Sequence, residues 1–447
     1  MKKHAIISQC LLLFVSLILS PAGAGAQQVE FSSTLNPVGS GARATGMGGA
    51  FISVADDATA ASWNPAGLIQ LENPEVSLVY SYFNRRQEYS SSVHPEIEST
   101  HDMETDGVNY ASAAYPFVLF NRNMIVSVNY QRLYEMDKSI NDLKLNIAGG
   151  KNANIHFEQT GYLYAISPAM AVQIIPGLSV GATLNIWDKN LTENGWETRQ
   201  RGEIQTVVER PAYDLLINEV ISETRDTSFS GVNANFGILW SVSDKFAVGA
   251  VYKTSFDADL GQKTDSSYDR SQTRTDTGVT TLYPTAFDSH SEDLTMKMPA
   301  SYGIGVSYRH SDALTVALDL YRTDWSRFVI VDSSGVERNP LDRLPVSEGR
   351  LTDTTQVRLG GEYLFIRDKY VVPFRLGLFY DPEPAKGSPD DYYGFSAGSG
   401  YSRERFAFDF SYQYRMGKGV SGDVPSVEGS EADIKQHTIM TSLIVYF

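Results

Sequence analysis

The sequence predicts an all-β fold: a 14-stranded antiparallel transmembrane β-barrel with an N-terminal plug segment. Apolar and polar residues alternate from about residue 75 to the end, the connections alternate between short and long, and the chain ends on an aromatic residue. Successive side chains of a strand point to opposite faces, so a barrel in a bilayer needs only every second residue to be apolar. The mean hydropathy of −0.22 is compatible with such a barrel.

The first 26 residues have the form of a secretory signal peptide. A basic start, "MKKH", precedes an apolar run of about 15 residues and the small-residue site "AGA" at 24–26, so we expect cleavage after Ala26. The single cysteine, Cys10, lies inside this signal, which leaves the exported chain without disulfides. The sequence therefore predicts three parts: a signal peptide (1–26), a plug (27–74) and a transmembrane barrel (75–447).

The alternation is clear in "FAFDFSYQYRM" at 406–416, where aromatic residues and a methionine share one face and Ala, Asp, Ser, Gln and Arg share the other. Similar stretches recur along the chain and are about 9–12 residues long, the length that a tilted strand needs to cross a bilayer. Soluble sandwiches have shorter strands on average. The lengths therefore favour a membrane barrel over a secreted, soluble multi-sandwich protein.

The connections support the same fold. Six short turns are predicted near 120–123, 175–177, 243–245, 311–313, 367–369 and 402–405. Between them lie seven long polar stretches, at about 91–106, 135–154, 191–227, 261–293, 328–353, 381–390 and 418–434. Short turns at one end and long loops at the other are typical of an outer-membrane barrel.

The C-terminal strand, "HTIMTSLIVYF", ends on Phe447 and resembles the terminal signature of bacterial outer-membrane barrels that the barrel assembly machinery reads. We therefore expect the cell outer membrane of a Gram-negative bacterium, with membrane lipid and lipopolysaccharide as further partners. Aromatic residues near strand ends, including Trp240, Tyr252 and Trp325, fit an interfacial girdle, although strands are generally rich in aromatic residues.

The stretch "DDATAASWNPAGL" at 56–68 lacks this alternation. Either Asp56 or Asp57 can cap a short helix over "ATAASW", and Pro65 disfavours a helical conformation at Asn64 and so ends that helix. The preceding glycines allow close backbone packing. Small residues, one ring and a sharp stop are what a compact plug requires. The plug residues that we single out are Gly46, Gly48, Gly49, Asp56, Asp57, Trp63, Asn64, Pro65, Ala66 and Gly67.

Several chemistries are not supported by the sequence. The formal charge of −16 argues against nucleic acid as a partner. "GSGARA" at 39–44 lacks the βαβ context of a dinucleotide site, and the histidines show no metal-ligand spacing. Ser307 and His310 are three positions apart on a strand and point to opposite faces, so they form no catalytic pair. We expect no enzyme activity, no catalytic residue, no metal and no cofactor.

The plug segment resembles the N-terminal region of the FadL/TodX family of outer-membrane transporters for hydrophobic compounds. "GMGGAF" at 46–51 and "ADDATAASWNPAGL" at 55–68 carry the resemblance, together with the 14-strand layout that ends on Phe447. It implies a hatch folded inside the barrel, to which the Asn64, Pro65 and Ala66 turn belongs. It also implies passive, plug-gated uptake of hydrophobic compounds such as long-chain fatty acids, with a sideways exit through the barrel wall.

Two sets of residues are candidates for the capture of the ligand and for its sideways exit. An apolar patch within "AYDLLINEVI" at 212–221 could form an amphipathic, ligand-capturing helix, with packing onto its own loop as the alternative; its residues are Leu215, Leu216, Ile217, Val220 and Ile221. Proline cannot donate to a β-ladder. Pro168, in a strand at 155–173 next to one at 124–134, and Pro116 are therefore candidate distortions of the wall.

A second function remains open. The "GMGGAF…NPAGL" opening also resembles PorV-type barrels, which act in protein secretion or surface attachment and bind protein partners. A general polar pore is a third possibility, against which a plug argues.

Overall fold

The computed structural model describes residues 35, 39–147, 151–192, 194–341, 345–422, 427 and 429–447. The predicted signal peptide lies outside these residues. Within them, no helix is long and apolar enough to cross a membrane.

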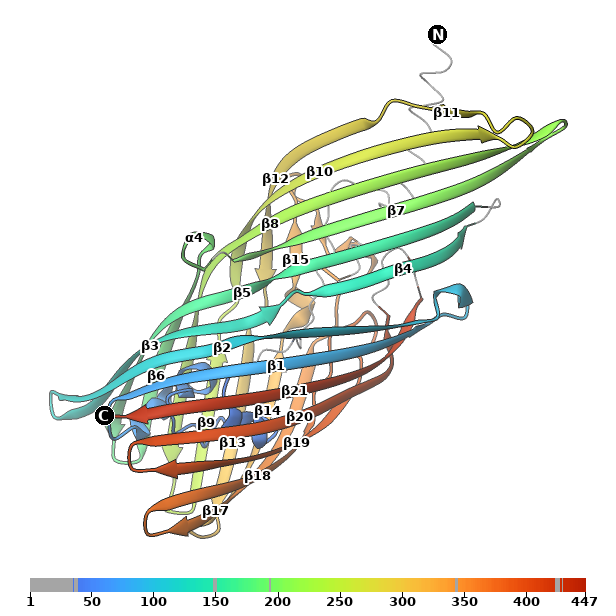
Figure 1. Cartoon of the computed structure of the whole chain (residues 1–447). Helices are drawn as coiled ribbons and strands as arrows, with labels where there is room; N and C mark the ends of the chain where they lie inside the picture. The colour runs from blue at the N-terminus through green and yellow to red at the C-terminus, as the bar shows by residue number, and fades with distance from the viewer. Residues whose placement is uncertain are drawn as a thin grey trace.

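The wall is one antiparallel sheet that closes on itself, because β1 pairs with β2 on one side and with β21 on the other. It is the predicted barrel of 14 strands, four of which are interrupted and carry two labels (Figure 1). In chain order the wall consists of β1 (Glu75–Ser90), β2 (Ser99–Leu119), β3 (Arg122–Glu135) with β4 (Lys138–Ile147), β5 (Lys151–Ile175), β6 (Leu178–Trp187) with β7 (Gly195–Arg210), β8 (Tyr213–Ser241), β9 (Phe246–Lys253) with β10 (Phe256–Arg274), β12 (Ala286–Met298) with β13 (Ser301–Arg309), β14 (Leu314–Thr323), β17 (Thr354–Arg367), β18 (Tyr370–Tyr380), β19 (Tyr392–Arg403), β20 (Phe406–Ser421) and β21 (Glu431–Tyr446).

The remaining elements are short. Three strands lie on the side of the long connections: β11 (Thr280–Leu282), β15 (Val329–Val331) and β16 (Glu337–Arg338). The helical turns are α2 (Ala42–Gly46), α3 (Ala60–Trp63), η1 (Pro65–Gln70), η2 (Pro95–Ile97), α4 (Lys189–Thr192), η3 (Trp325–Arg327) and η4 (Val346–Glu348).

The six short turns are confirmed, but three of the predicted long loops are wrong. Most of 135–154, 191–227 and 261–293 is strand, so that β5 has 25 residues and β8 has 29. At about 3.3 Å per residue these strands reach far beyond a hydrocarbon core of about 30 Å. They form a sheet that rises on one side of the molecule, past the shorter strands β13, β14, β17, β18 and β19 (Figure 1). One face of this extension buries a cluster of apolar side chains that includes Ile140, Ile155 and Ile204, but polar residues flank them along each strand, so these stretches resemble polar loops in the sequence.

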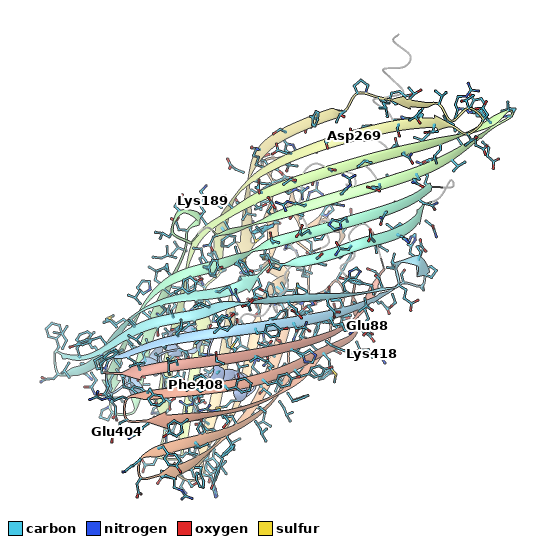
Figure 2. The ribbon with its side chains drawn as sticks, in the orientation of Figure 1. Glu88, Lys189, Asp269, Glu404, Phe408 and Lys418 are labelled. Atoms are coloured by element: carbon cyan, nitrogen blue, oxygen red, sulfur yellow. The ribbon has the colours of Figure 1, made fainter. Side chains whose placement is uncertain are left out.

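An apolar band surrounds the barrel near its short-turn end. Large apolar side chains point outward there from successive strands, among them Leu78, Phe236, Leu376 and Phe408, the last of which is labelled in Figure 2. Trp240 and Tyr252 are also exposed, as a girdle requires. The prediction that Trp325 belongs to the girdle is wrong. Its side chain is 1% exposed and packs against Phe328 inside the molecule, because η3 turns it inward.

Candidate functional site: the lumenal segment and a slot in the wall

Residues 39–71, which we call the lumenal segment, lie inside the barrel at the level of the apolar band. Helix α2 packs against β18 to β21, and η1 packs against β3, β5, β6 and β8. Of the two predicted capping carboxylates, Asp57 accepts hydrogen bonds from the Thr59 amide (2.8 Å) and hydroxyl (2.5 Å) just before α3. Asp56 instead forms an ion pair with Arg43.

The predicted break at Asn64 is present. Asn64 has an extended backbone (φ −142°, ψ 102°), and Pro65 opens the η1 turn. The fully buried Asn64 amide donates to the Ile52 carbonyl (2.9 Å) and, across to the wall, to the Ile238 carbonyl on β8 (3.0 Å). Its side-chain oxygen accepts from the Ala66 amide (3.2 Å). Asn64 therefore joins two parts of the lumenal segment to each other and to the barrel.

Glycines allow the lumenal backbone to approach the wall. A Cβ on Gly48, which has a φ of +68°, would lie 3.1 Å from the Cα of Gly377 on β18, and a Cβ on Gly377 would lie 2.1 Å from the Gly48 nitrogen. The wall glycines Gly181 and Gly237 face Pro65 and Asn64 in the same way. These wall glycines were not predicted, because the sequence does not show which strand positions face the lumenal segment.

The opposite side of the lumenal segment is held by buried charges. Arg43 donates to both oxygens of Glu362 on β17 (3.0 and 2.9 Å), and Glu362 also accepts from Arg375 (2.6 Å). A carboxylate on β14, Asp319, accepts from the Phe51 and Ile52 amides (2.6 and 2.8 Å). Removing one member of such a buried pair strongly destabilises the folded protein, because the other charge is left without a partner. These contacts therefore fix the position of this segment.

The remaining predicted plug residues are placed as follows. Trp63 is 2% exposed, donates from its indole nitrogen to the Ser40 carbonyl (2.8 Å) and meets Phe51 edge to face. A Cβ on Gly67 would lie 2.0 Å from the Ala55 carbonyl oxygen, which requires glycine there. Gly46 lies against Gly398 of β19, and Gly49 lies against Arg358.

The wall is interrupted between β2 and β3. Their backbone pairing runs from Leu119 and Arg122 up to Tyr110 and Gln131, and no pair joins the two strands beyond that point among the described residues. Above it, residues 99–109 of β2 pair only with β1, whereas β3 continues along β5 and is followed there by β4. We call the resulting gap between the two strand edges the slot.

Both strands bulge where they separate. The β1–β2 register shifts at Asn109, and the β3–β5 register shifts at Leu133. A β-bulge bends a strand and increases its twist, so two bulges at one level turn the two edges apart. The sequence gives little sign of either bulge, because each requires only one residue out of alternation.

Side chains bridge the slot where backbone hydrogen bonds are missing. The Asn109 amide donates to the Arg132 carbonyl (3.1 Å), and the Arg132 guanidinium donates back to the Asp106 carbonyl (3.2 Å) and to the Ser81 hydroxyl (3.3 Å). Arg132 also pairs with Glu135 (2.7 Å). Two polar side chains therefore satisfy part of the exposed strand edges, which is needed next to lipid.

The slot is closed again at its extracellular end. Ile97 of η2 packs with the β4 residues Ile140 and Leu143, and the Asn146 amide donates to the Glu96 carboxylate (2.9 Å). This hydrogen bond holds the pKa of Glu96 below its ordinary value. The slot is thus a window in the wall, bounded below by the last backbone pair of β2 and β3 and above by the contact between η2 and β4.

The two candidate prolines do not border this window. Pro116 pairs with Ile125 and Pro168 pairs with Val128, both within the regular ladder below it. Between β5 and β6 the pairs skip Ser167 and Pro168, which is the local effect expected of a residue without an amide hydrogen.

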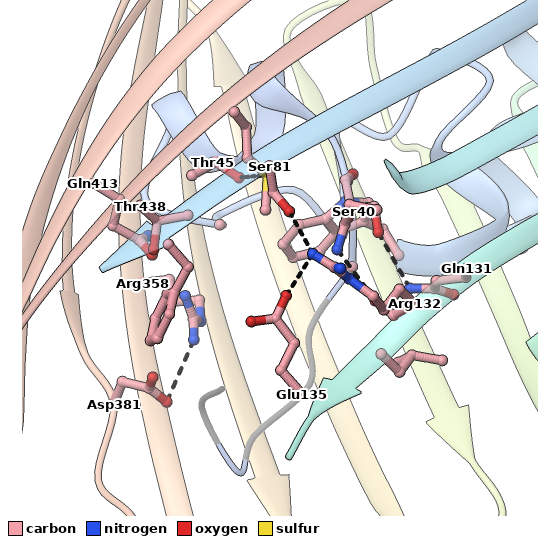
Figure 3. A pocket seen from close by; sticks show the side chains of 17 residues that line it. Ser40, Thr45, Ser81, Gln131, Arg132, Glu135, Arg358, Asp381, Gln413 and Thr438 are labelled. Atoms are coloured by element: carbon pink, nitrogen blue, oxygen red, sulfur yellow. Dashed lines mark hydrogen bonds and ion pairs between the residues drawn. The ribbon is translucent and has the colours of Figure 1, made fainter. Parts of the chain in front are cut away.

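A cavity of about 130 Å³ lies between the lumenal segment and the slot (Figure 3). Trp63 and Gly49 of the lumenal segment line it on one side, and Asn109, Arg132 and Leu133 line it at the slot. Gln131 and Leu133 also line a second, smaller space, whose walls include the stacked rings of Trp187 and Phe256. The two spaces and the slot are therefore neighbours inside the barrel.

The predicted ligand-capture segment does not form a helix. It lies in β8, beyond the apolar band, and its apolar residues alternate between the faces of the sheet. Ile221 packs with Tyr268 against the core cluster of the extension, whereas Leu216 and Val220 belong to the opposite face. The five residues Leu215, Leu216, Ile217, Val220 and Ile221 are half-buried, so the structure spreads them over both faces of the sheet.

One family model, that of outer membrane transport proteins (OMPP1/FadL/TodX), matches residues 15–439 of this barrel-forming chain. The chain belongs to the FadL/TodX family. The match covers nearly the whole chain, so the resemblance predicted from the plug segment is confirmed, as is the location in the outer membrane of a Gram-negative bacterium. No curated protein sequence matches the chain.

Solved structures of FadL/TodX proteins share the fold. A Pseudomonas aeruginosa FadL homologue is 15% identical (TM-score 0.58), and the alignment covers 95% of this chain and 100% of that one. The Pseudomonas putida toluene transporter TodX is 13% identical (TM-score 0.56; 94% and 100% covered), and the monoaromatic hydrocarbon channel CymD is 17% identical (TM-score 0.55; 92% and 98%). At these identities the likeness concerns the fold.

Among the described residues, no group of three or more His, Cys, Asp or Glu side chains is arranged to hold a metal ion. The terminal Phe447 lies just beyond β21, is 74% exposed and donates its amide to the Pro74 carbonyl (3.0 Å). Its role in assembly stays a prediction.

Proposed function

We propose that this chain lets hydrophobic compounds, long-chain fatty acids among them, diffuse passively across the outer membrane and leave sideways through the slot. The observation that carries the proposal is the placement of the cavity, which is in contact with both the lumenal segment and the two bulged strand edges. A compound in the cavity lies beside the bridge between Asn109 and Arg132, so it would leave between the unpaired strand edges above that bridge.

A sideways exit suits apolar cargo. Transfer of apolar surface from water into lipid is favourable, so a hydrophobic compound gains free energy when it leaves at the level of the membrane. Beside the slot, three tyrosine rings gather on β3 and β5: Tyr130 stacks on Tyr164, which also contacts Tyr162. Tyrosine is enriched where hydrocarbon meets the polar boundary, so we place the slot at the extracellular edge of the apolar band.

The lumenal segment acts in this proposal as the hatch. Residues 39–71 occupy the lumen of the barrel, and their contacts through Asn64, Arg43 and the wall carboxylate Asp319 keep the hydrophilic route shut. Transport then requires no catalytic residue and no cofactor, and the concentration gradient drives it.

The extracellular sheet would make the first contact with cargo. Its outermost hairpin exposes Val279, Leu282 and Phe287, the last to 80%. The same apolar tip favours a second candidate, the PorV-type role of binding a protein partner. In that case deletion of 279–287 would abolish a specific protein complex and leave the uptake of small compounds unchanged.

Uptake in cells that lack their own transporter tests the proposal. We expect the chain to increase uptake of labelled oleate or labelled toluene over cells with an empty vector, without raising the entry of a polar solute of similar size. Surface insertion must be verified by protease accessibility. Correct insertion with no uptake of either compound would contradict the proposal, and equal entry of the polar solute would indicate a general pore.

A further inference from the structure

The cavity beside the slot contains a guanidinium nitrogen without a hydrogen-bond partner. Arg132 is 5% exposed, and its two terminal nitrogens are occupied by Asp106, Ser81 and Glu135. Its third nitrogen, Nε, is buried and has no acceptor among the described residues. Figure 3 shows the Arg132 side chain at the centre of the cavity, between β3 and Ser81.

A buried polar group without a partner costs free energy, and nearly all such groups in folded proteins are satisfied. Trp63, Phe83, Leu133 and Met440 contribute apolar surface to the same cavity. Polar side chains such as Gln131, Asp381 and Gln413 line the rest of it, but none of the described residues bonds to this nitrogen. The Asn109 side-chain oxygen at the slot is also buried, and none of the described residues donates to it. The cavity therefore has a mixed lining, with two buried polar atoms next to the exit that have no hydrogen-bond partner within the described residues.

The charge of Arg132 is already balanced. Its ion pair with Glu135 (2.7 Å) places a carboxylate directly beside the guanidinium, and its face lies over the Tyr162 ring at 4.9 Å. Arg132 Nε therefore lacks a hydrogen-bond acceptor, whereas the guanidinium already has a counter-charge. An uncharged oxygen meets it as well as an anion does.

We propose that Arg132 Nε binds an oxygen atom at one end of the cargo, so that the protein selects oxygenated hydrophobic compounds, such as alcohols and acids, over hydrocarbons. This inference rests on the proposed function and names the substrate class of the same site. A hydroxyl group could donate in turn to Asn109 Oδ1, whereas a hydrocarbon leaves both atoms unsatisfied. Arg132 is then a specificity-determining residue as well as a bridge across the slot.

The test is equilibrium binding of radiolabelled dodecanol and dodecane to the purified full chain in nanodiscs, with empty nanodiscs subtracted. The two compounds differ by one oxygen. A hydrogen bond to a charged group favours dodecanol by about tenfold or more in Kd. In Arg132→Met we expect this ratio to fall to about one through weaker binding of dodecanol, while the Kd of dodecane changes little.

Two further variants keep the result interpretable. Arg132→Lys retains a donor and should keep part of the preference, and Arg201→Met, which removes an exposed arginine paired with Glu203, should keep all of it. Equal binding of both compounds by the wild-type chain would overturn the inference and leave the proposed transport of hydrophobic compounds standing. A preference that survives in Arg132→Met would overturn it as well. Binding of neither compound would contradict both.

Discussion

Asn64 shows how one side chain can hold an irregular segment inside a barrel. Pro65 fixes an extended backbone before η1 and thereby leaves nearby backbone groups without the partners that a helix would provide. Within the segment the Asn64 side chain donates to the Ile52 carbonyl and accepts from the Ala66 amide, and on β8 it donates to the Ile238 carbonyl. The "NPA" stretch is therefore both the turn and the attachment of the lumenal segment.

Replacing this amide should loosen the segment. In Asn64→Ala the Ile52 and Ile238 carbonyls lose their donor, at a cost of about 1–3 kcal/mol for each buried group left unsatisfied. We expect more frequent openings in single-channel recordings. Gln70→Ala is the matched control, because Gln70 is exposed and bonds only to Ala55. If Asn64→Ala opened no more often than the wild-type protein, this attachment would not be what holds the segment.

At the scale of the elements, the packing of the lumenal segment against the wall strands depends on glycines, which have no side chain. The lumenal segment approaches β6, β8 and β18 at glycines, so the backbones themselves are in contact. The lumenal backbone comes closest at Gly377, where an added Cβ would lie 2.1 Å from the Gly48 nitrogen. The neighbouring strand provides a comparison, because at Gly361 of β17 the nearest atom to an added Cβ is 3.9 Å away.

Gly377→Ala should therefore displace the lumenal segment, whereas Gly361→Ala should not. The added methyl group would lie 2.1 Å from the Gly48 nitrogen, and the backbone there cannot move without breaking the Gly48 contacts with Arg358 and Ser396. We expect a lower midpoint of thermal unfolding and faster proteolysis of residues 39–71 in Gly377→Ala alone. Equal behaviour of the two variants would argue against close packing at this site.

The sequence was sufficient for the elements that obey a simple period. Alternation and turn length located the wall strands, and Pro65 located the break after α3. The same reasoning failed at 212–221, because half-buried Leu and Ile residues on both faces of an extracellular strand resemble a short amphipathic helix. It also did not find the slot, since the bulges at Asn109 and Leu133 and the bridge from Arg132 depend on which strands become neighbours.

At the scale of the whole molecule, the lumenal segment and the slot together determine the route. Buried charges bind the segment to β14 and β17, and Asn64 binds it to β8. The wall is meanwhile interrupted above Gln131 on β3, next to the cavity. The lumenal segment can therefore stay inside the barrel while a compound leaves, because the slot beside the cavity provides an exit through the wall.

The most direct test of this route is a reversible lock across the slot. Thr105 and Tyr162 face each other across it with their hydroxyl oxygens 3.4 Å apart, and Cys10 in the predicted signal is the single native cysteine. Thr105→Cys/Tyr162→Cys would be bridged by a short bis-thiosulfonate reagent. The control pair, Ser112→Cys/Asn129→Cys, lies lower down, where β2 and β3 are already paired.

Uptake of labelled oleate would be measured before bridging, after bridging and after reduction. The account predicts that bridging the slot pair stops uptake and that reduction restores it, while the control pair transports throughout. Undiminished uptake through the bridged slot would contradict a sideways exit at this place.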